Sequence, residues 1–118
     1  TGAKDFGLNH VNLLPGAGWS SRYSYAYTGS LSGFQAIQVA GWHNPSRIIL
    51  LGYDMQHTGG KTHWHGDHED KRWPNCPNLH KQIGEFSKLA EEATTPIINA
   101  TRETALTCFE RKRLEDIE

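Results

Sequence analysis

The chain lacks the features that membrane-spanning and nucleic-acid-binding proteins need. Its longest apolar run, Ile48 to Leu51, is far shorter than the roughly 18 residues that cross a bilayer. Its 12 lysines and arginines are balanced by 13 aspartates and glutamates, so no excess of positive charge attracts a phosphate backbone or an anionic membrane. We therefore expect neither a membrane span nor a nucleic-acid partner.

Cysteines and targeting signals are scarce as well. Cys76 lies between two prolines and Cys108 lies in an expected helix, which favours free thiols and a reducing, cytoplasmic location. The first residues do not have the basic-then-apolar order of a signal peptide. A length of 118 residues predicts one domain over 1–118, and a start at Thr1 without a methionine leads us to expect a fold truncated at its N-terminus.

What the chain does contain is a series of short apolar segments typical of an α/β domain. The continuous, β-branched run 47–51 is typical of a strand buried on both faces of a parallel sheet. The expected strands are 10–14, 47–51 and 96–99, and the expected helices are 30–44, 79–94 and 103–109. Long loops are expected at 16–29 and 55–77, and a charged tail at 110–118. This order predicts a Rossmann-like three-layer domain with a mostly parallel sheet.

The first two expected helices supply most of the expected core. Ser30 can cap the first helix with its hydroxyl, and Pro45 ends that helix because the residue before a proline avoids the helical conformation. The second helix carries an apolar stripe at helical spacing. The residues assigned to the core are Trp42, Leu79, Ile83, Phe86 and Leu89.

Three groups of polar residues follow the expected strands, at the edge where ligands of parallel sheets bind. Tyr23, Tyr25 and Tyr27 precede the helix, and their hydroxyls either position a phosphate or pack on the sheet edge. Asp54 ends the central strand and either contacts a ligand hydroxyl or a metal, or caps the next turn. The third group is the histidine-rich loop.

Five of the seven histidines fall between His57 and His80, and this cluster favours a site there. Imidazoles two and three residues apart on an extended loop can converge on a divalent ion such as zinc. The ligands under this interpretation are His63, His65, Asp67 and His68. Alternatively, one histidine is a general base, because imidazole titrates near neutral pH. The plainer alternative is a loop that only covers the sheet edge.

Several segments resemble the bacterial sialyltransferases of the Campylobacter type. Residues 28–34 and 47–54 are similar to that family's Thr/Ser-Gly turn opening a helix and to its strand ending in Gly-x-Asp. Thr62-His63-Trp64 looks like the family's Ser-His-Tyr segment, and the resemblance extends over about residues 28–109. The chain departs from the family in lacking its Gly-rich nucleotide-binding turn.

The resemblance implies inverting transfer from a nucleotide sugar to an acceptor, with no cofactor required. His63 would then be the base that deprotonates the acceptor hydroxyl, with Asp54 also at the catalytic site. The residues implied to approach or stabilise the donor phosphate are Ser30, Ser32, Gly33, Tyr23, Tyr25 and Tyr27.

The segment from Asn99 to Leu106, followed by Phe109 and Leu114, matches the expected end of small phage-encoded proteins of the norphogenetic type. The whole chain resembles these proteins, which implies the cytoplasm of a bacterial host. Three functions stay open. The first is a glycosyltransferase-like enzyme that binds a nucleotide sugar and an acceptor. The second is a metal-binding protein or metal-dependent hydrolase, since the string from Thr62 to His68 resembles the signature of metallo-β-lactamase-like hydrolases; zinc is expected only here. The third is a non-catalytic phage accessory or assembly protein that self-associates as a homo-oligomer.

Overall fold

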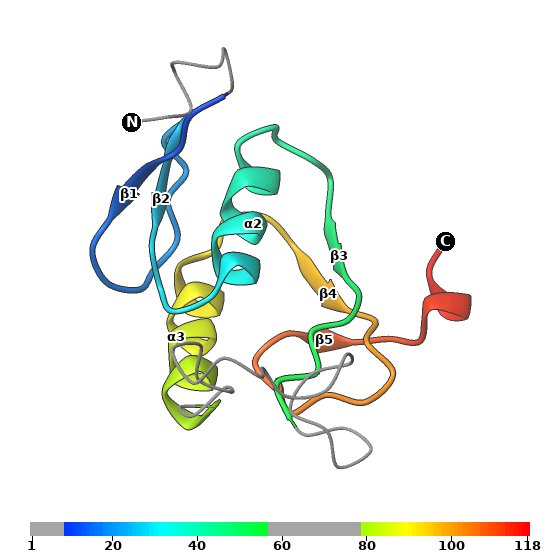
Figure 1. The fold of residues 1–118 in the computed structure, drawn as a ribbon. Coiled ribbons are helices and arrows are strands. Elements are labelled where there is room, and N and C mark those ends of the chain that lie inside the picture. The colour runs from blue at the N-terminus through cyan, green and yellow to red at the C-terminus, as the bar shows by residue number, and fades with distance from the viewer. Residues whose placement is uncertain (1–8, 57–78) are drawn as a thin grey trace.

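Short parallel sheets and two α-helices make up the part of the chain that the computed structural model describes, residues 9–56 and 79–118 (Figure 1). The strands are β1 (Asn12–Leu14), β2 (Tyr25–Tyr27), β3 (Ile48–Leu50), β4 (Ile97–Asn99) and β5 (Glu110–Arg111). The helices are α2 (Ser32–Gly41), α3 (Leu79–Glu92) and the 3-10 helix η2 (Leu114–Asp116). The expected α/β class and its parallel strand pairing are therefore confirmed.

The C-terminal sheet consists of β3, β4 and β5 in that order, with both neighbouring pairs parallel. Ile48 pairs with Ile97, and Ile98 pairs with Glu110. Most residues of β3 and β4 are buried, because the β-branched side chains of their isoleucines pack well on a pleated surface. The expected strands at 47–51 and 96–99 are confirmed, each slightly shorter than predicted.

Aromatic rings join the two α-helices to this sheet. The ring of Phe86 on α3 makes edge contacts with Phe34 on α2, with Tyr53 after β3 and with Phe109 before β5, at centroid distances of 5.5, 6.0 and 6.5 Å. Such edge-to-face contacts stabilise a core beyond the burial of area alone. The stripe expected on α3 is confirmed at its centre, since Phe86 and Leu89 are both buried.

The N-terminal sheet pairs β1 with β2 in parallel, with Leu13 opposite Ala26. The sequence predicted an unstructured loop over 16–29, and that prediction is wrong for Tyr25–Tyr27. The cause is the local alternation of two tyrosines around a fully buried Ala26, a strand pattern too short to stand out among glycines and serines.

Side chains of α2, rather than another strand, close the free edge of β2. The fully buried Gln38 accepts hydrogen bonds from the N–H of Tyr27 at 2.8 Å and of Ser20 at 3.2 Å, and its amide nitrogen donates to the carbonyl of Tyr27 at 3.0 Å. The indole N–H of Trp42 donates to the carbonyl of Tyr25 at 3.0 Å. Because these groups already satisfy the edge of β2, β3 does not pair with it, and the two sheets stay separate.

These contacts bear on two further predictions from the sequence. Trp42, assigned to the core, is only partly buried, and its indole N–H bonds to the edge of β2 instead.

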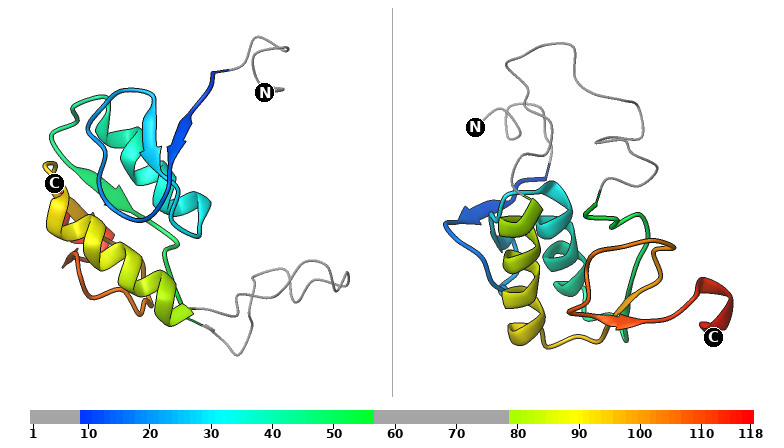
Figure 2. Two further views of the ribbon diagram at one scale, coloured as in Figure 1. Left: turned by 90° about the vertical axis from the view of Figure 1, so that its left-hand side faces the viewer. Right: turned by 90° about the horizontal axis from the view of Figure 1, so that it is seen from below.

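The two α-helices lie side by side (Figure 2) and touch through Phe34 and Phe86, so they form one layer. The Rossmann-like three-layer arrangement is therefore not confirmed by the described residues.

Local hydrogen bonds also replace the helix expected over 103–109. The Thr104 hydroxyl accepts from the N–H of Leu106 at 3.1 Å and donates to the carbonyl of Tyr53 at 2.5 Å, and these bonds compete with helix formation. The segment is accordingly a series of bends, and Cys108 is a half-buried free thiol outside any helix. The tail expected at 110–118 forms β5 and η2.

The α2 helix begins after Leu31, with no side-chain cap, so the capping role expected of Ser30 is wrong. Within residues 9–56 and 79–118, no helix is long and apolar enough to cross a membrane.

Candidate functional site

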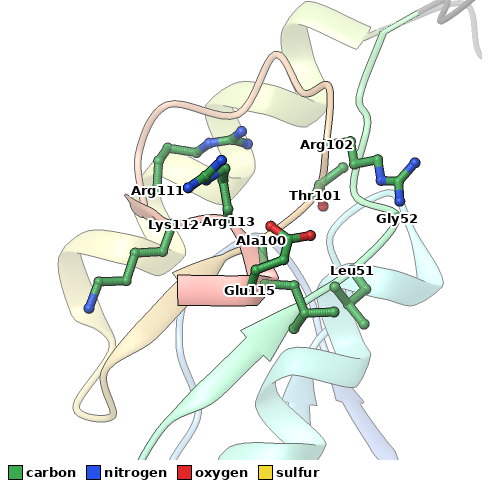
Figure 3. A pocket seen from close by; sticks show the side chains of 10 residues that line it. Leu51, Gly52, Ala100, Thr101, Arg102, Arg111, Lys112, Arg113 and Glu115 are labelled. Atoms are coloured by element: carbon green, nitrogen blue, oxygen red, sulfur yellow. The ribbon is translucent and has the colours of Figure 1, made fainter. Parts of the chain in front are cut away.

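The carboxyl ends of β3, β4 and β5 meet at one edge of the C-terminal sheet, and a pocket of about 410 Å³ opens there (Figure 3). Ligands of parallel sheets bind outside this edge, and pockets for small molecules usually enclose about 300–1,000 Å³. The lining residues are Leu51, Gly52, Ala100, Thr101, Arg102, Arg111, Lys112, Arg113, Leu114 and Glu115. Position and size both suit a small-molecule site.

Positive charge dominates the lining of this pocket, which we call the basic pocket. Arg102 follows β4, whereas Arg111, Lys112 and Arg113 come from β5 and the residues after it. Figure 3 shows the side chains of Arg111 and Arg113 next to each other, with Arg102 across the pocket and Lys112 extending away from them. The lining thus has four cationic residues, of which the three arginines group around the cavity, and one carboxylate, that of Glu115.

Only one of these cations is neutralised by an ion pair within the described part of the chain. Arg113 donates to the Asp116 carboxylate, with Nε and Oδ2 3.0 Å apart. Arg102, Arg111 and Lys112 form no ion pair with a residue in 9–56 or 79–118. Their charge remains available to an anion, and an arginine can hold a phosphate or carboxylate through two parallel hydrogen bonds.

Hydrogen bonds between neighbouring loops hold the rim of the pocket in place. The hydroxyl of the buried Thr101 accepts from the N–H of Tyr53 at 3.0 Å, and the carbonyl of Asp54 accepts from the N–H of Ala105 at 2.8 Å. The side chain of Asn99 accepts from the N–H of Thr101 at 3.1 Å. These bonds tie the end of β3 to the loop after β4, which carries Arg102.

Tyr53 connects this edge to the first turn of α2. Its hydroxyl donates to the carbonyl of Gly33 at 3.0 Å, and a Cβ added at Gly33 would lie only 3.1 Å from its ring. Burial raises the pKa of the Tyr53 phenol above its ordinary value of 10.0. A side chain at position 33 would press against the Tyr53 ring, which would have to shift by a few tenths of an ångström.

Some of the residues predicted from the sequence lie close to one another, although none of those within the described residues lines the basic pocket. Gly33 contacts Tyr53, and the half-buried Asp54 follows Tyr53 directly, so the start of α2 and the end of β3 are adjacent. Ser32 is the exposed first residue of α2, and Ser30 is an exposed residue just before it.

Two of the three predicted tyrosines lie elsewhere. The ring of Tyr23 is 71% exposed and stands 5.6 Å from that of Trp42, beyond the C-terminal end of α2. The guanidinium of Arg22 lies 3.9 Å from the centroid of the Tyr25 ring. Tyr23 and Tyr25 are therefore at the end of α2 opposite Ser32. Tyr27 is closer to the start of α2, with its backbone bound by Gln38.

The predicted base and metal ligands, His63, His65, Asp67 and His68, lie outside the described residues. In the described ranges, no group of three or more histidine, cysteine or acidic side chains could hold a metal ion. The zinc hypothesis from the histidine cluster is thus untested.

The basic pocket itself was missed by the sequence analysis. Its cations come from two segments, and only the parallel pairing of β4 with β5 brings Arg102 near Arg111. One local signal was present, because Arg111, Lys112 and Arg113 form the longest basic run in the chain.

Comparison with known proteins gives no relative: no family model matches the chain, and no match is found among the curated proteins or the solved structures. The resemblance to sialyltransferases therefore stays a prediction.

Proposed function

We propose that this domain binds a small organic anion in the basic pocket. The observation that carries the proposal is the set of cations without an ion-pair partner in the described residues, Arg102, Arg111 and Lys112, in a cavity at the carboxyl edge of parallel strands. Charge-assisted hydrogen bonds from arginine to a phosphate or carboxylate are among the strongest that proteins make. A phosphate group satisfies this arrangement best, because it offers several acceptor oxygens to side chains on both sides of the cavity.

Transfer from a nucleotide sugar is the specific form of this proposal. In it the basic pocket holds the donor phosphate, Asp54 lies two residues beyond the pocket-lining Gly52, and His63 deprotonates the acceptor hydroxyl. The adjacency of Gly33 and Tyr53 supports this version, since it places the start of α2 beside the end of β3. Ser30 and Ser32 are exposed at the start of α2, and in this version of the proposal their hydroxyls approach the same donor.

Binding is tested by calorimetric titration with cytidine and uridine nucleotides. Each hydrogen-bonded charge contributes about 1.5–3 kcal/mol, so Arg102→Ala or Arg111→Ala should each weaken nucleotide binding by about 10- to 150-fold. Lys88→Ala is the matched control, because it removes an exposed cation of α3 that does not line the pocket. If the arginine variants bind as tightly as the unaltered protein, the basic pocket is not the nucleotide site.

Catalysis is tested separately with His63→Ala. Loss of sugar transfer with nucleotide affinity retained is the expected result, since a base is needed for the reaction and not for donor binding. His43→Ala serves as the control, because this exposed histidine lies beyond the end of α2. Transfer at the normal rate in His63→Ala would refute the assigned base, and stoichiometric zinc in the purified protein would favour the metal-site hypothesis instead.

A further inference from the structure

Exposed leucines share the basic pocket with the cations. The large apolar side chains most exposed in the described residues are Leu13, Tyr23, Leu51 and Leu114. Of these, Leu51 is 57% exposed and Leu114 is 49% exposed, and both line the basic pocket. A single exposed leucine is ordinary on a protein surface, but two in one cationic cavity form a mixed apolar and charged lining.

The fold by itself does not require leucine at either position. Leu50 is buried in β3, and Leu51 follows it with its side chain exposed at the end of the strand. Leu114 begins η2, in which no residue is buried. Neither side chain belongs to the cluster of buried residues around Phe86, so their apolar surface is left for a ligand.

We infer that the ligand of the basic pocket is a soluble phosphate ester whose organic group is apolar where it meets Leu51 and Leu114. The inference rests on the proposed function, because the phosphate is assigned to Arg102 and Arg111. The cavity of about 410 Å³ has room for an organic group beside a phosphate. The phosphate therefore determines where the ligand sits in the pocket, and burial of its organic group against the leucines adds affinity.

The surrounding charges favour a small soluble ligand over the surface of an anionic membrane. Exposed carboxylates flank the pocket in the sequence, among them Glu110, Glu115 and Asp116. An anionic bilayer would have to approach these carboxylates together with the cations, and its negative headgroups would be repelled by them. A small phosphate ester enters the cavity without meeting all of them.

The test compares inorganic phosphate with hexyl phosphate in calorimetric titrations of the full chain. If about two methylene groups of the chain become buried, the hexyl ester binds about tenfold more tightly than phosphate. The double variant Leu51→Ser, Leu114→Ser should reduce this ratio to about twofold or less while inorganic phosphate binds as before. Leu13→Ser is the matched control, because that leucine is exposed on β1 and does not line the pocket.

The outcomes separate the inference from the function on which it rests. Equal binding of phosphate and hexyl phosphate to the unaltered protein would overturn the inference and leave anion binding in place. An unchanged ratio in the double serine variant, with folding verified by circular dichroism, would also overturn it. No binding of either probe would overturn the proposed function itself. Leucine-dependent binding to phosphatidylserine vesicles without binding of hexyl phosphate would replace the soluble ligand with a membrane.

Discussion

The two sheets of this protein are bounded in different ways. The edge of β2 is satisfied by side chains, because Gln38 of α2 and Trp42 directly after that helix bond to its backbone. The edge of β3 is instead extended by the strands β4 and β5. A sheet capped by a helix cannot grow, whereas a sheet extended by strands collects several carboxyl ends at one edge.

This difference determines where a ligand site can be built. The carboxyl end of β2 runs directly into Thr28, Gly29 and the start of α2, so few chain segments meet there. At the C-terminal sheet, three chain segments end beside each other and bring Leu51, Arg102 and Arg111 to one cavity. Stability in the first region is expected to depend on polar contacts, and in the second on the aromatic core.

The largest effect is expected from Phe86→Ala in the second region. Phe86 is buried and its ring contacts those of Phe34, Tyr53 and Phe109. Truncation of such a side chain leaves a cavity and lowers the free energy of unfolding by about 3–5 kcal/mol. Urea denaturation measures this change. A loss below about 1 kcal/mol would contradict the aromatic core as the main support of the C-terminal sheet.

A smaller but still large effect is expected from Gln38→Leu in the first region. The change leaves both backbone groups of Tyr27 and the N–H of Ser20 without their amide partner. Unpaired groups that are only partly buried cost about 1 kcal/mol each, so the loss of three partners should lower the free energy of unfolding by about 3 kcal/mol. The amide of Tyr27 should also exchange its hydrogen much faster.

Gln35→Leu on the same helix is the matched control, because the Gln35 side chain donates a single bond, to the carbonyl of Thr28. It should lose about 1 kcal/mol. Equal losses in Gln35→Leu and Gln38→Leu would show that the edge of β2 does not depend on Gln38.

The smallest effect is expected at the contact between the regions, in Tyr53→Phe. Loss of the bond from the Tyr53 hydroxyl to the Gly33 carbonyl should cost about 1 kcal/mol at neutral pH. Because burial raises the pKa of Tyr53 above 10.0, this phenol stays protonated in the folded chain at pH values where the unfolded chain ionises. Its contribution is complete below pH 10 and is lost as the pH rises through the raised pKa.

Denaturation of both proteins between pH 8 and pH 11, a range chosen to span the ordinary pKa of about 10, measures this linkage. The stability advantage of the unaltered protein over Tyr53→Phe should shrink at the alkaline end. An advantage independent of pH would mean that the Tyr53 phenol is not buried in the folded protein.

The sequence predicted the regular elements wherever one physical signal was strong. The continuous β-branched run at β3 and the apolar stripe of α3 arise from burial on defined faces, and both elements are found. The helix expected over 103–109 failed because Thr104 bonds to Tyr53 and Leu106, a competition that periodicity does not register. β2 was not predicted because it is short and because its pairing with β1, more than ten residues earlier, leaves no periodic signal in the sequence.

The candidate site was harder to predict for a similar reason. The parallel sheet led us to expect a site at its carboxyl edge, and a pocket does open there, with Asp54 two residues beyond its lining residue Gly52. The cations did not stand out, because β5 is a two-residue strand with both side chains exposed and no periodic pattern. Pairing across the sheet, rather than spacing along the chain, brings Arg102 and Arg111 to the same pocket.

The most direct test of a ligand site at the C-terminal sheet is a nuclear magnetic resonance titration of the ¹⁵N-labelled protein with cytidine monophosphate. Amide shifts confined to residues 51–52, 100–102 and 111–115 are the predicted result, because these segments line the basic pocket. Shifts centred on β1, β2 and the Tyr23 side of α2, or no shifts at millimolar ligand, would contradict it.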